Sequence, residues 1–263
     1  MSNPRIVITD GAYVVEGGIP LYLDAIGKSA DGSHLEFRRI RQIPTGKGPY
    51  LLCSCGRSKT MPFCDYSHMT ESPKFDGSET AAREPYFERA RVYEGNGLKM
   101  HDDGRCSFAR LCHYNGRSVW NMSGGFDGEM KNEQVNAAWH CPSGRLVVED
   151  ADTGVVHEPE YEPSIVVLED VGLNCSGPLF VRGGVELVGQ DGFVYETQNR
   201  YALCRCGKSF NKPFCDAMHH HEEVFEDGVI FNDGSVPSLE EWQAGAESSG
   251  TLDTSFEEFP RES

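Results

Sequence analysis

Short apolar runs broken by Gly-Gly pairs occur near the start of the chain and again in its last third. Residues 11–21 read GAYVVEGGIPL and residues 177–187 read GPLFVRGGVEL, so apolar and polar positions follow a similar order in both. Runs of this kind around glycine are typical of strands separated by a turn or a bulge. We therefore expect two strands in each segment, and a further short strand at residues 50–52 and at residues 201–203.

The region between these segments has a different periodicity. Residues 98–100 alternate as a short strand does, and residues 145–149 read as another strand. Between them, Val135, Ala138 and Trp139 recur at the spacing of one helix face, which predicts a helix over residues 129–140. The first repeat also carries an insertion around residues 27–49, and we expect it to form a surface hairpin or loop.

The composition favours small, turn-rich domains over one large apolar core, with 38% hydrophobic residues, 29 Gly and 14 Pro in 263 residues. No apolar run is long enough to span a membrane, and no signal-like apolar segment follows the first residues. We expect a cytoplasmic protein without a membrane partner. The spacing of the ten Cys is typical of metal ligands in a reducing compartment rather than of disulfides.

The formal net charge of −17 argues against nucleic acid as a partner, because phosphate binding needs a basic surface. An acidic surface can instead steer docking to a redox partner protein that carries a basic docking surface. Solubility alone is the alternative role for this charge.

One sequence pattern, C-x-C-x2-S-x3-P-x-C-D-x2-H, occurs twice. The candidate ligands of the first copy are Cys53, Cys55, Cys64 and His68. Those of the second copy are Cys204, Cys206, Cys215 and His219. In each copy the C-x-C pair can hold one iron, and a Cys with the His four residues later can hold another, which predicts a [2Fe–2S] cluster. A zinc site with three thiolates and one imidazole is the alternative, although zinc sites favour wider Cys spacing.

This pattern closely resembles the CDGSH iron–sulfur domain family. The resemblance implies one [2Fe–2S] cluster per copy, held by three Cys and one His. It also implies small β-rich folds that pair as two-fold dimers, so two copies in one chain look like such a dimer made covalent. We therefore expect an intramolecular pseudo-dimer and a monomeric protein.

The chain departs from the family pattern beside the ligands. The family Gly is Tyr66 in the first copy and Ala217 in the second, and the family Ser is Met218 in the second copy. Because Gly often marks a strained or crowded backbone position, these changes predict ligand loops of a different shape. Asp65 and Asp216 match the family Asp, and we expect them to cap the following turn or to orient a ligand.

A third set of cysteines lies between the two copies, at Cys106, Cys112 and Cys141. The order strand, C-x5-C loop, helix, Cys-Pro, strand resembles single-cluster ferredoxins. In that family the middle Cys would stand at Ala109, and three cysteines without it suit a [3Fe–4S] cluster. Three unrelated cysteines are the alternative.

A [4Fe–4S] cluster at this third set would need a fourth ligand. The candidates are His113, His140 and Cys175. For Cys175, a small buried apolar residue is the alternative interpretation.

These patterns predict an α+β, β-rich fold. Residues 1–85 would form the first CDGSH-type domain, residues 86–158 a ferredoxin-like α+β domain and residues 159–232 the second CDGSH-type domain. Residues 233–263 are acidic and predict a disordered tail. A docking tail with Trp242, Phe256 and Phe259 as anchors is the alternative.

The sequence contains no Gly-rich phosphate loop, no dinucleotide fingerprint and no nucleophile–base pair with useful spacing. We therefore expect a one-electron carrier and not an enzyme, although it could be a subunit of a larger oxidoreductase. The alternative is a cluster-transfer or redox- and pH-sensing protein, because a protonated imidazole cannot bind iron.

Overall fold

The computed structural model describes residues 3–29, 35–114, 116–123, 129–221 and 235–248. Its strands are β1 (Arg5–Thr9), β2 (Ala12–Glu16), β3 (Leu21–Lys28), β4 (Leu35–Ile43), β5 (Tyr50–Cys53), β6 (Arg91–Gly95), β7 (Leu98–Asp102), β8 (His113–Tyr114), β9 (Arg117–Ser118), β10 (Leu146–Asp150), β11 (Val156–His157), β12 (Ser164–Asp170), β13 (Cys175–Arg182), β14 (Glu186–Val188) and β15 (Arg200–Leu203). Its helices are α1 (Ser67–Thr70), α2 (Tyr86–Arg89), α3 (Val119–Ser123), α4 (Glu129–Trp139), α5 (Met218–His221) and α6 (Leu239–Ser248). The chain is β-rich with few helices, as the α+β prediction requires.

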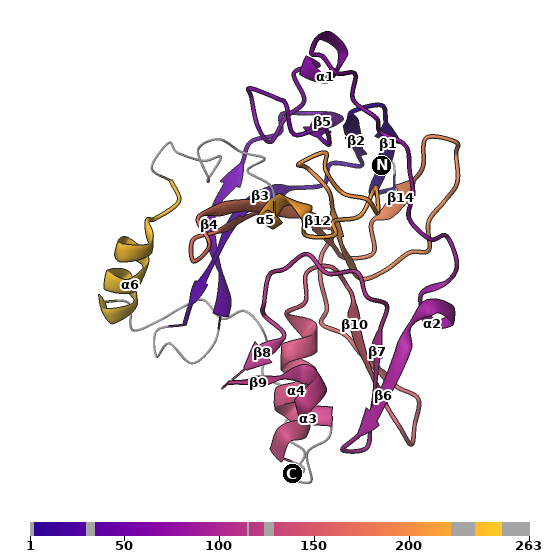
Figure 1. Ribbon diagram of the computed structural model, residues 1–263, viewed down its shortest axis with the longest axis vertical. Coiled ribbons are helices and arrows are strands. Elements are labelled where there is room, and N and C mark those ends of the chain that lie inside the picture. The colour runs from indigo at the N-terminus through magenta and orange to yellow at the C-terminus, as the bar shows by residue number, and fades with distance from the viewer. Residues whose placement is uncertain (1–2, 30–34, 115, 124–128, 222–234, 249–263) are drawn as a thin grey trace.

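Two sheets share strands from both halves of the chain (Figure 1). One has the order β14-β1-β2-β5 and the other the order β15-β13-β12-β3-β4. Strand β14 pairs in parallel with β1, and β3 pairs in parallel with β12. The first sheet therefore contains one strand of the second repeat, β14, and the second sheet contains two strands of the first repeat, β3 and β4.

The Gly-Gly pairs stand where the chain leaves one sheet for the other. The strands predicted around them are present, since β2 ends just before Gly17-Gly18 and β13 just before Gly183-Gly184. All four glycines have positive φ, between 66° and 86°, a backbone region that side chains with a Cβ avoid. The strands on either side do not pair with each other, because the turn sends the second one into the other sheet.

The main core lies between these sheets and draws on both repeats. Ile6, Leu21 and Leu52 pack in it with Val167 and Leu203, all fully buried. Burial of this apolar surface, worth roughly 25 cal/mol per Å², holds the two repeats together. The insertion around residues 27–49 forms a hairpin as predicted, because β4 returns antiparallel to β3.

The region between the repeats has its own sheet and core (Figure 1). Its sheet has the order β11-β10-β7-β6 and is antiparallel throughout. The predicted strands are β7 and β10, and the predicted helix is α4. Val135 and Ala138 of α4 pack on Met100 and Val148 of the sheet, as the helical spacing indicated.

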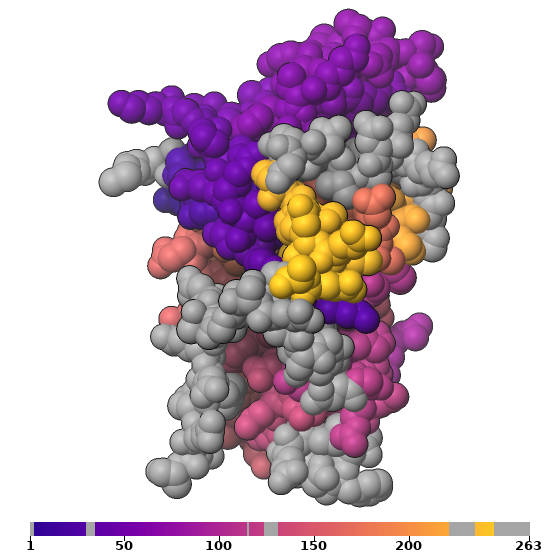
Figure 2. Space-filling model, turned by 90° about the vertical axis from the view of Figure 1, so that its left-hand side faces the viewer, coloured from indigo at the N-terminus to yellow at the C-terminus, as the bar shows by residue number. Residues whose placement is uncertain are grey.

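The prediction of a disordered tail is wrong for residues 239–248, which form α6. Ser238 begins this helix with reciprocal bonds: its amide donates to Glu241 Oε2 at 2.8 Å, and its hydroxyl accepts the Glu241 amide at 3.2 Å. The apolar anchor is Trp242, only 1% exposed, which packs on Ala25. Figure 2 shows the helix lying against the N-terminal part of the chain. Phe256 and Phe259 lie outside the described residues.

None of the helices within the described ranges has the length and apolar character needed to cross a membrane.

Candidate metal centres

The first copy of the pattern forms a loop after β5, and its four candidate ligands fall into two pairs. The Sγ atoms of Cys53 and Cys55 lie 3.5 Å apart. Cys64 Sγ lies 3.8 Å from Nδ1 of His68, which α1 presents at its second residue. Gly11 of the β1–β2 turn faces the His68 ring so closely that a Cβ there would overlap it.

The second copy repeats this arrangement after β15. The Sγ atoms of Cys204 and Cys206 lie 3.6 Å apart, and Cys215 Sγ lies 3.5 Å from His219 Nδ1. The two loops meet, because Cys55 and Cys206 form an isolated antiparallel β-bridge. The structure thus brings the two predicted sets side by side.

The donor sets suit a two-iron cluster better than a single ion. Among the residues that the structure describes, no group of three or more His, Cys, Asp or Glu side chains converges on one metal ion. Instead each loop offers a thiol pair and a thiol–imidazole pair, which is how the ligands of a [2Fe–2S] cluster with one imidazole divide between two irons. The chemistry of the donors therefore fits the group, and the ligand assignments themselves stay predictions.

Backbone amides help to stabilise one thiolate in each loop. The hydrogen bond from Cys55, followed by the amides of Ser58 and Gly56, lowers the pKa of Cys53 to about 6 despite burial. The matching donors lower the pKa of Cys204 to about 7. Both thiols therefore favour the deprotonated form that binds metal.

Asp65 and Asp216 cap the turns that carry the His, as predicted. Asp65 accepts the Ser67 amide at 3.0 Å and the Lys59 amide at 2.8 Å. Although burial raises the pKa of Asp65, these donors outweigh it and lower the pKa to about 2. Asp216 accepts the Met218 amide at 3.3 Å and the Phe210 amide at 2.8 Å.

The residues that replace the family Gly keep a backbone conformation that Gly favours. Tyr66 has φ 65° and Ala217 has φ 73°, both in the left-handed region. Both residues therefore hold a left-handed backbone although each carries a Cβ, and the expected difference in loop shape stays a prediction. The capping carboxylates and the amide–sulfur contacts at Cys64 and Cys215 hold both residues in this conformation.

We expect Tyr66→Gly to stabilise the protein by about 1 kcal/mol, because it removes left-handed strain at a side chain that is 54% exposed. The thermal midpoint should rise by about 2–4 °C. Phe87→Gly is the matched control, since Phe87 is also a half-exposed aromatic residue but lies within helix α2. It should lower the midpoint. A lower midpoint in both variants would contradict the strain argument.

The segment that follows the third cysteine differs in exposure between the two loops, while His68 and His219 are equally buried, at 7% and 8% exposed. Around the first, Tyr66 and Met69 are 54% and 73% exposed. In the second, Cys215 and Ala217 are only 3% and 6% exposed. The covering residues come from the middle region: Phe108 stacks on His220 with ring centroids 4.4 Å apart, and the Arg105 guanidinium lies 4.4 Å from the ring of Phe214.

Packing and hydrogen bonds link the three middle cysteines: Cys112 packs with Cys141, and the Ser143 hydroxyl joins Cys141 Sγ to the carbonyl of Arg105, next to Cys106. Burial raises the pKa of Cys112 to about 12, and the charges on Cys141 and Cys106 contribute. Burial also raises the pKa of Cys215 well above its usual range, with a contribution from Cys106. The Phe108–His220 and Arg105–Phe214 contacts likewise place the segment around Cys106 beside the second loop.

Ala109 does not share the surroundings of these cysteines. It packs with Leu111 against Val166 and Phe180 of the second sheet, whereas Cys112 and Cys141 belong to the core of the middle region. A fourth ligand at this position is therefore not expected from the structure.

The three candidates for a fourth ligand lie in different places. His113 Nδ1 is 3.4 Å from Cys112 Sγ. His140 Nδ1 instead lies 2.6 Å from the carbonyl of Asn136, one turn back on its own helix. Cys175 begins β13 opposite Asp170, and burial raises its pKa to about 11. Of the three, His113 is the candidate whose ring nitrogen lies beside a cysteine sulfur of this set.

Sequence reasoning missed several side chains that support the loops. Arg200, 1% exposed, donates to the carbonyls of Ala138, Trp139, Cys141 and Leu146 at 2.7–2.9 Å, and pairs with Glu158. Arg205, between two ligands, forms a buried pair with Glu169 at 2.6 Å. Tyr13 of the first repeat donates to the carbonyl of Cys204 at 2.7 Å. In the sequence, the only indication of this support was the presence of Arg200 and Arg205 beside and within the second pattern.

Comparison with protein families finds one match. The model described as iron-binding zinc finger, CDGSH type, matches residues 10–69 and residues 176–220. Comparison with curated proteins and with solved structures gives no match. The two matched segments contain both ligand loops and the strands that lead into them. The chain therefore carries two copies of the CDGSH domain, one in each matched segment.

Proposed function

We propose that this iron–sulfur protein is a one-electron carrier and not an enzyme. Each CDGSH loop would hold one [2Fe–2S] cluster through its three Cys and one His. The observation that carries the proposal is the Cys55–Cys206 bridge, which brings two complete donor sets into contact within one chain. When bound, such clusters accept and release single electrons. The residues of the two loops hold the donors in place and, in the second loop, keep water away from the thiols.

The fold supports an intramolecular pseudo-dimer. Exchange of β14 and β3 between the sheets gives each repeat a strand in its neighbour's sheet. Neither sheet is complete without both repeats, so this arrangement would suit a protein that works as a monomer. The cytoplasm would supply the reducing environment that ten free cysteines need.

The positions of the three cysteine sets favour a relay. In Figure 1 the loop of α1 lies at one end of the long axis, α5 near the centre, and α4 with the middle region at the other end. The Phe108–His220 stack joins the middle loop to the second copy. Electrons would then pass between the exposed first loop and the middle set through the second loop.

For the middle set we propose a [3Fe–4S] cluster on Cys106, Cys112 and Cys141, or a [4Fe–4S] cluster with a fourth ligand. His113 is the best-placed fourth ligand because it contacts Cys112. Ser143 orients the remaining thiol: its hydroxyl lies 3.2 Å from Cys141 Sγ and donates to the carbonyl of Arg105 at 2.7 Å.

The exposed first loop suits contact with a partner protein. Tyr66 and Met69 are the largest exposed apolar side chains beside His68. With a net charge of −17, the rest of the chain would attract a redox partner that has a basic docking surface.

The same exposure favours a second candidate function, the transfer of a cluster to an acceptor protein. Cys64 is partly exposed, whereas Cys215 is buried, so the first cluster would be the one released. A reductase and an apo-acceptor, tested side by side, separate the two functions. Electron transfer faster than cluster loss supports the carrier.

The first test of the proposal is the iron and sulfide content of anaerobically purified protein, with EPR spectra before and after reduction. Two [2Fe–2S] clusters are EPR-silent when oxidised, whereas a [3Fe–4S] cluster gives a signal near g of about 2.0. We expect this signal in the protein as isolated, and its loss in Cys141→Ser.

A colourless protein that contains zinc would overturn the iron assignment. A silent oxidised protein with four irons in the middle set would require a fourth ligand, which His113→Ala would then test.

A further inference from the structure

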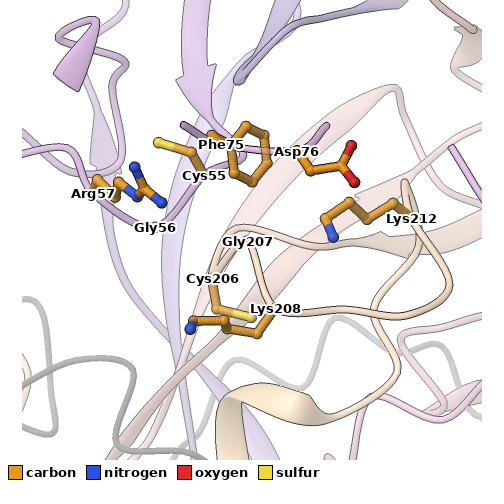
Figure 3. Close-up of a pocket in the computed structure, with 9 residues that line it drawn as sticks. All are labelled: Cys55, Gly56, Arg57, Phe75, Asp76, Cys206, Gly207, Lys208 and Lys212. Carbon is orange, nitrogen blue, oxygen red and sulfur yellow. The ribbon is translucent and has the colours of Figure 1, made fainter. Parts of the chain in front are cut away.

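A cavity of about 290 Å³ opens between the two CDGSH loops (Figure 3). Its floor is made by the bridge residues Cys55 and Cys206 with the glycines that follow them. Gly56 and Gly207 have φ near 76° and approach the opposite carbonyl so closely that a Cβ on either would overlap it. The cavity therefore lies on the contact between the repeats and depends on both glycines.

Three cations line this cavity in a strongly acidic chain. Arg57 and Lys208 are equivalent positions of the two copies, and Lys212 joins them from the second loop. Asp76 is the one carboxylate among the lining residues. The cavity thus combines three basic side chains with one acidic side chain, against a net charge of −17 overall.

Two of these cations donate hydrogen bonds to backbone carbonyls rather than to carboxylates. Arg57 Nη1 donates to the carbonyl of Pro73 at 2.6 Å, and Lys212 Nζ donates to the carbonyl of Ser209 at 2.8 Å. Carbonyl oxygens carry only partial charge, so a bound anion would still be attracted.

The remaining wall is an aromatic ring that the chain brings over from the first repeat. Phe75 is buried, and Lys212 Nζ lies 5.9 Å from the centre of its ring. The segment after it is fixed to the second loop, because the amides of Thr80 and Ala81 both donate to the carbonyl of Lys212, at 2.8 and 2.9 Å. The wall and the cations are therefore held as one unit.

We propose that this cavity binds a small molecule that carries a phosphate group. The phosphate would lie among Arg57, Lys208 and Lys212, and an organic body would lie against Phe75. Its size matches the lower end of small-ligand pockets. Inorganic phosphate and a phosphate monoester share the chemistry that these cations recognise.

Binding here would be linked to the redox state, an effect that rests on the proposed electron-carrier function, whereas binding itself does not. A dianion beside Cys55 and Cys206 adds negative charge near both clusters, so it should lower both potentials. By linkage, reduction of the clusters should weaken phosphate binding by the same factor.

The binding test is calorimetric titration of the holoprotein with inorganic phosphate and with phenyl phosphate. We expect saturable 1:1 binding of both, with phenyl phosphate tighter because its ring can contact Phe75. Lys212→Met, which installs the residue found at the equivalent Met61, should weaken binding about tenfold. The matched control is Lys47→Gln at an exposed position that is not among the lining residues, and it should bind as the parent does.

Asp76→Asn tests the site through an increase in phosphate affinity, which a misfolded variant would not produce. Asn can still accept the Ser78 amide that Asp76 accepts at 2.9 Å, but it removes the one lining carboxylate. Binding should tighten severalfold.

No saturable binding up to about 10 mM of either probe would overturn the proposal, as would equal weakening by Lys47→Gln. Variants that shift the potentials without changing phosphate binding would show that the cations only balance cluster charge. Iron and sulfide counts on the same sample separate either failure from loss of the clusters.

Discussion

His68→Cys is expected to lower the reduction potential of the first cluster by on the order of 100–300 mV and to leave the second nearly unchanged. A thiolate adds a negative charge where a neutral imidazole stood. This charge stabilises the oxidised cluster relative to the reduced cluster, so the reduction potential falls. Clusters with two His ligands lie several hundred millivolts above all-Cys clusters, so one replacement should recover about half of that difference. The smaller side chain fits the space over Gly11, which already faces the His68 ring at close range.

Each copy serves as the control for the other. His219→Cys should shift only the second cluster, and the double variant should shift both. Redox titration followed by EPR and visible circular dichroism measures these changes. The same variants should lose iron more slowly in acid, because a protonated imidazole cannot bind iron and a Cys removes that step. Unchanged potentials and unchanged acid stability in both variants would mean that these histidines are not ligands.

Trp242→Ala is expected to release α6 from the sheet at a cost of about 3–5 kcal/mol, the range for removing a large buried aromatic side chain. Trp242 is 1% exposed, and its Nε1 donates to the carbonyl of Lys28 at 2.7 Å. The guanidinium of Arg38 lies 3.9 Å from its ring centre, and a Cβ on Gly27 would overlap the ring. These contacts join α6 to the β3–β4 hairpin.

Hydrogen exchange measures this effect locally. Amides of residues 239–244 should lose protection in Trp242→Ala, while the iron content stays that of the parent. Leu239→Ala is the matched control, because Leu239 lies on the same helix but is 42% exposed, and it should change stability by less than about 0.5 kcal/mol. Equal protection in Trp242→Ala and in the parent would contradict the docking of α6.

The expectations that succeeded rest on residues close together in sequence. Strands β2 and β13, helix α4 and both ligand loops follow from local periodicity and from Cys and His spacing. Capping by Asp65 and Asp216 also acts within a few residues. At Tyr66 and Ala217, which replace the family Gly, the backbone is left-handed although both residues carry a Cβ. There the loop's own bonds impose a left-handed backbone whichever residue is present.

The expectation for the C-terminal segment failed because it was based on composition. An acidic, Gly- and Ser-containing stretch is typical of a disordered tail. A single Trp with a matching gap at Gly27 supplies enough buried surface to hold a short helix, and nothing local to Trp242 indicates that gap. Ala109 presents the same difficulty, since spacing places it in a cysteine series while packing turns it towards Phe180.

By itself, the sequence determined the two CDGSH domains, the candidate donor residues and the strands and turns around them, because metal-ligand spacing and secondary-structure periods act over short stretches. Only the tertiary structure decided which strands exchange between the sheets, that Cys55 meets Cys206, and that Cys215 is buried while Cys64 is partly exposed. It also created the basic cavity, whose lining residues come from both repeats. These features depend on contacts between residues more than a hundred positions apart. Hydrophobic burial drives such contacts, and because it is non-directional, an apolar residue does not indicate in the sequence which other residue it will pack against.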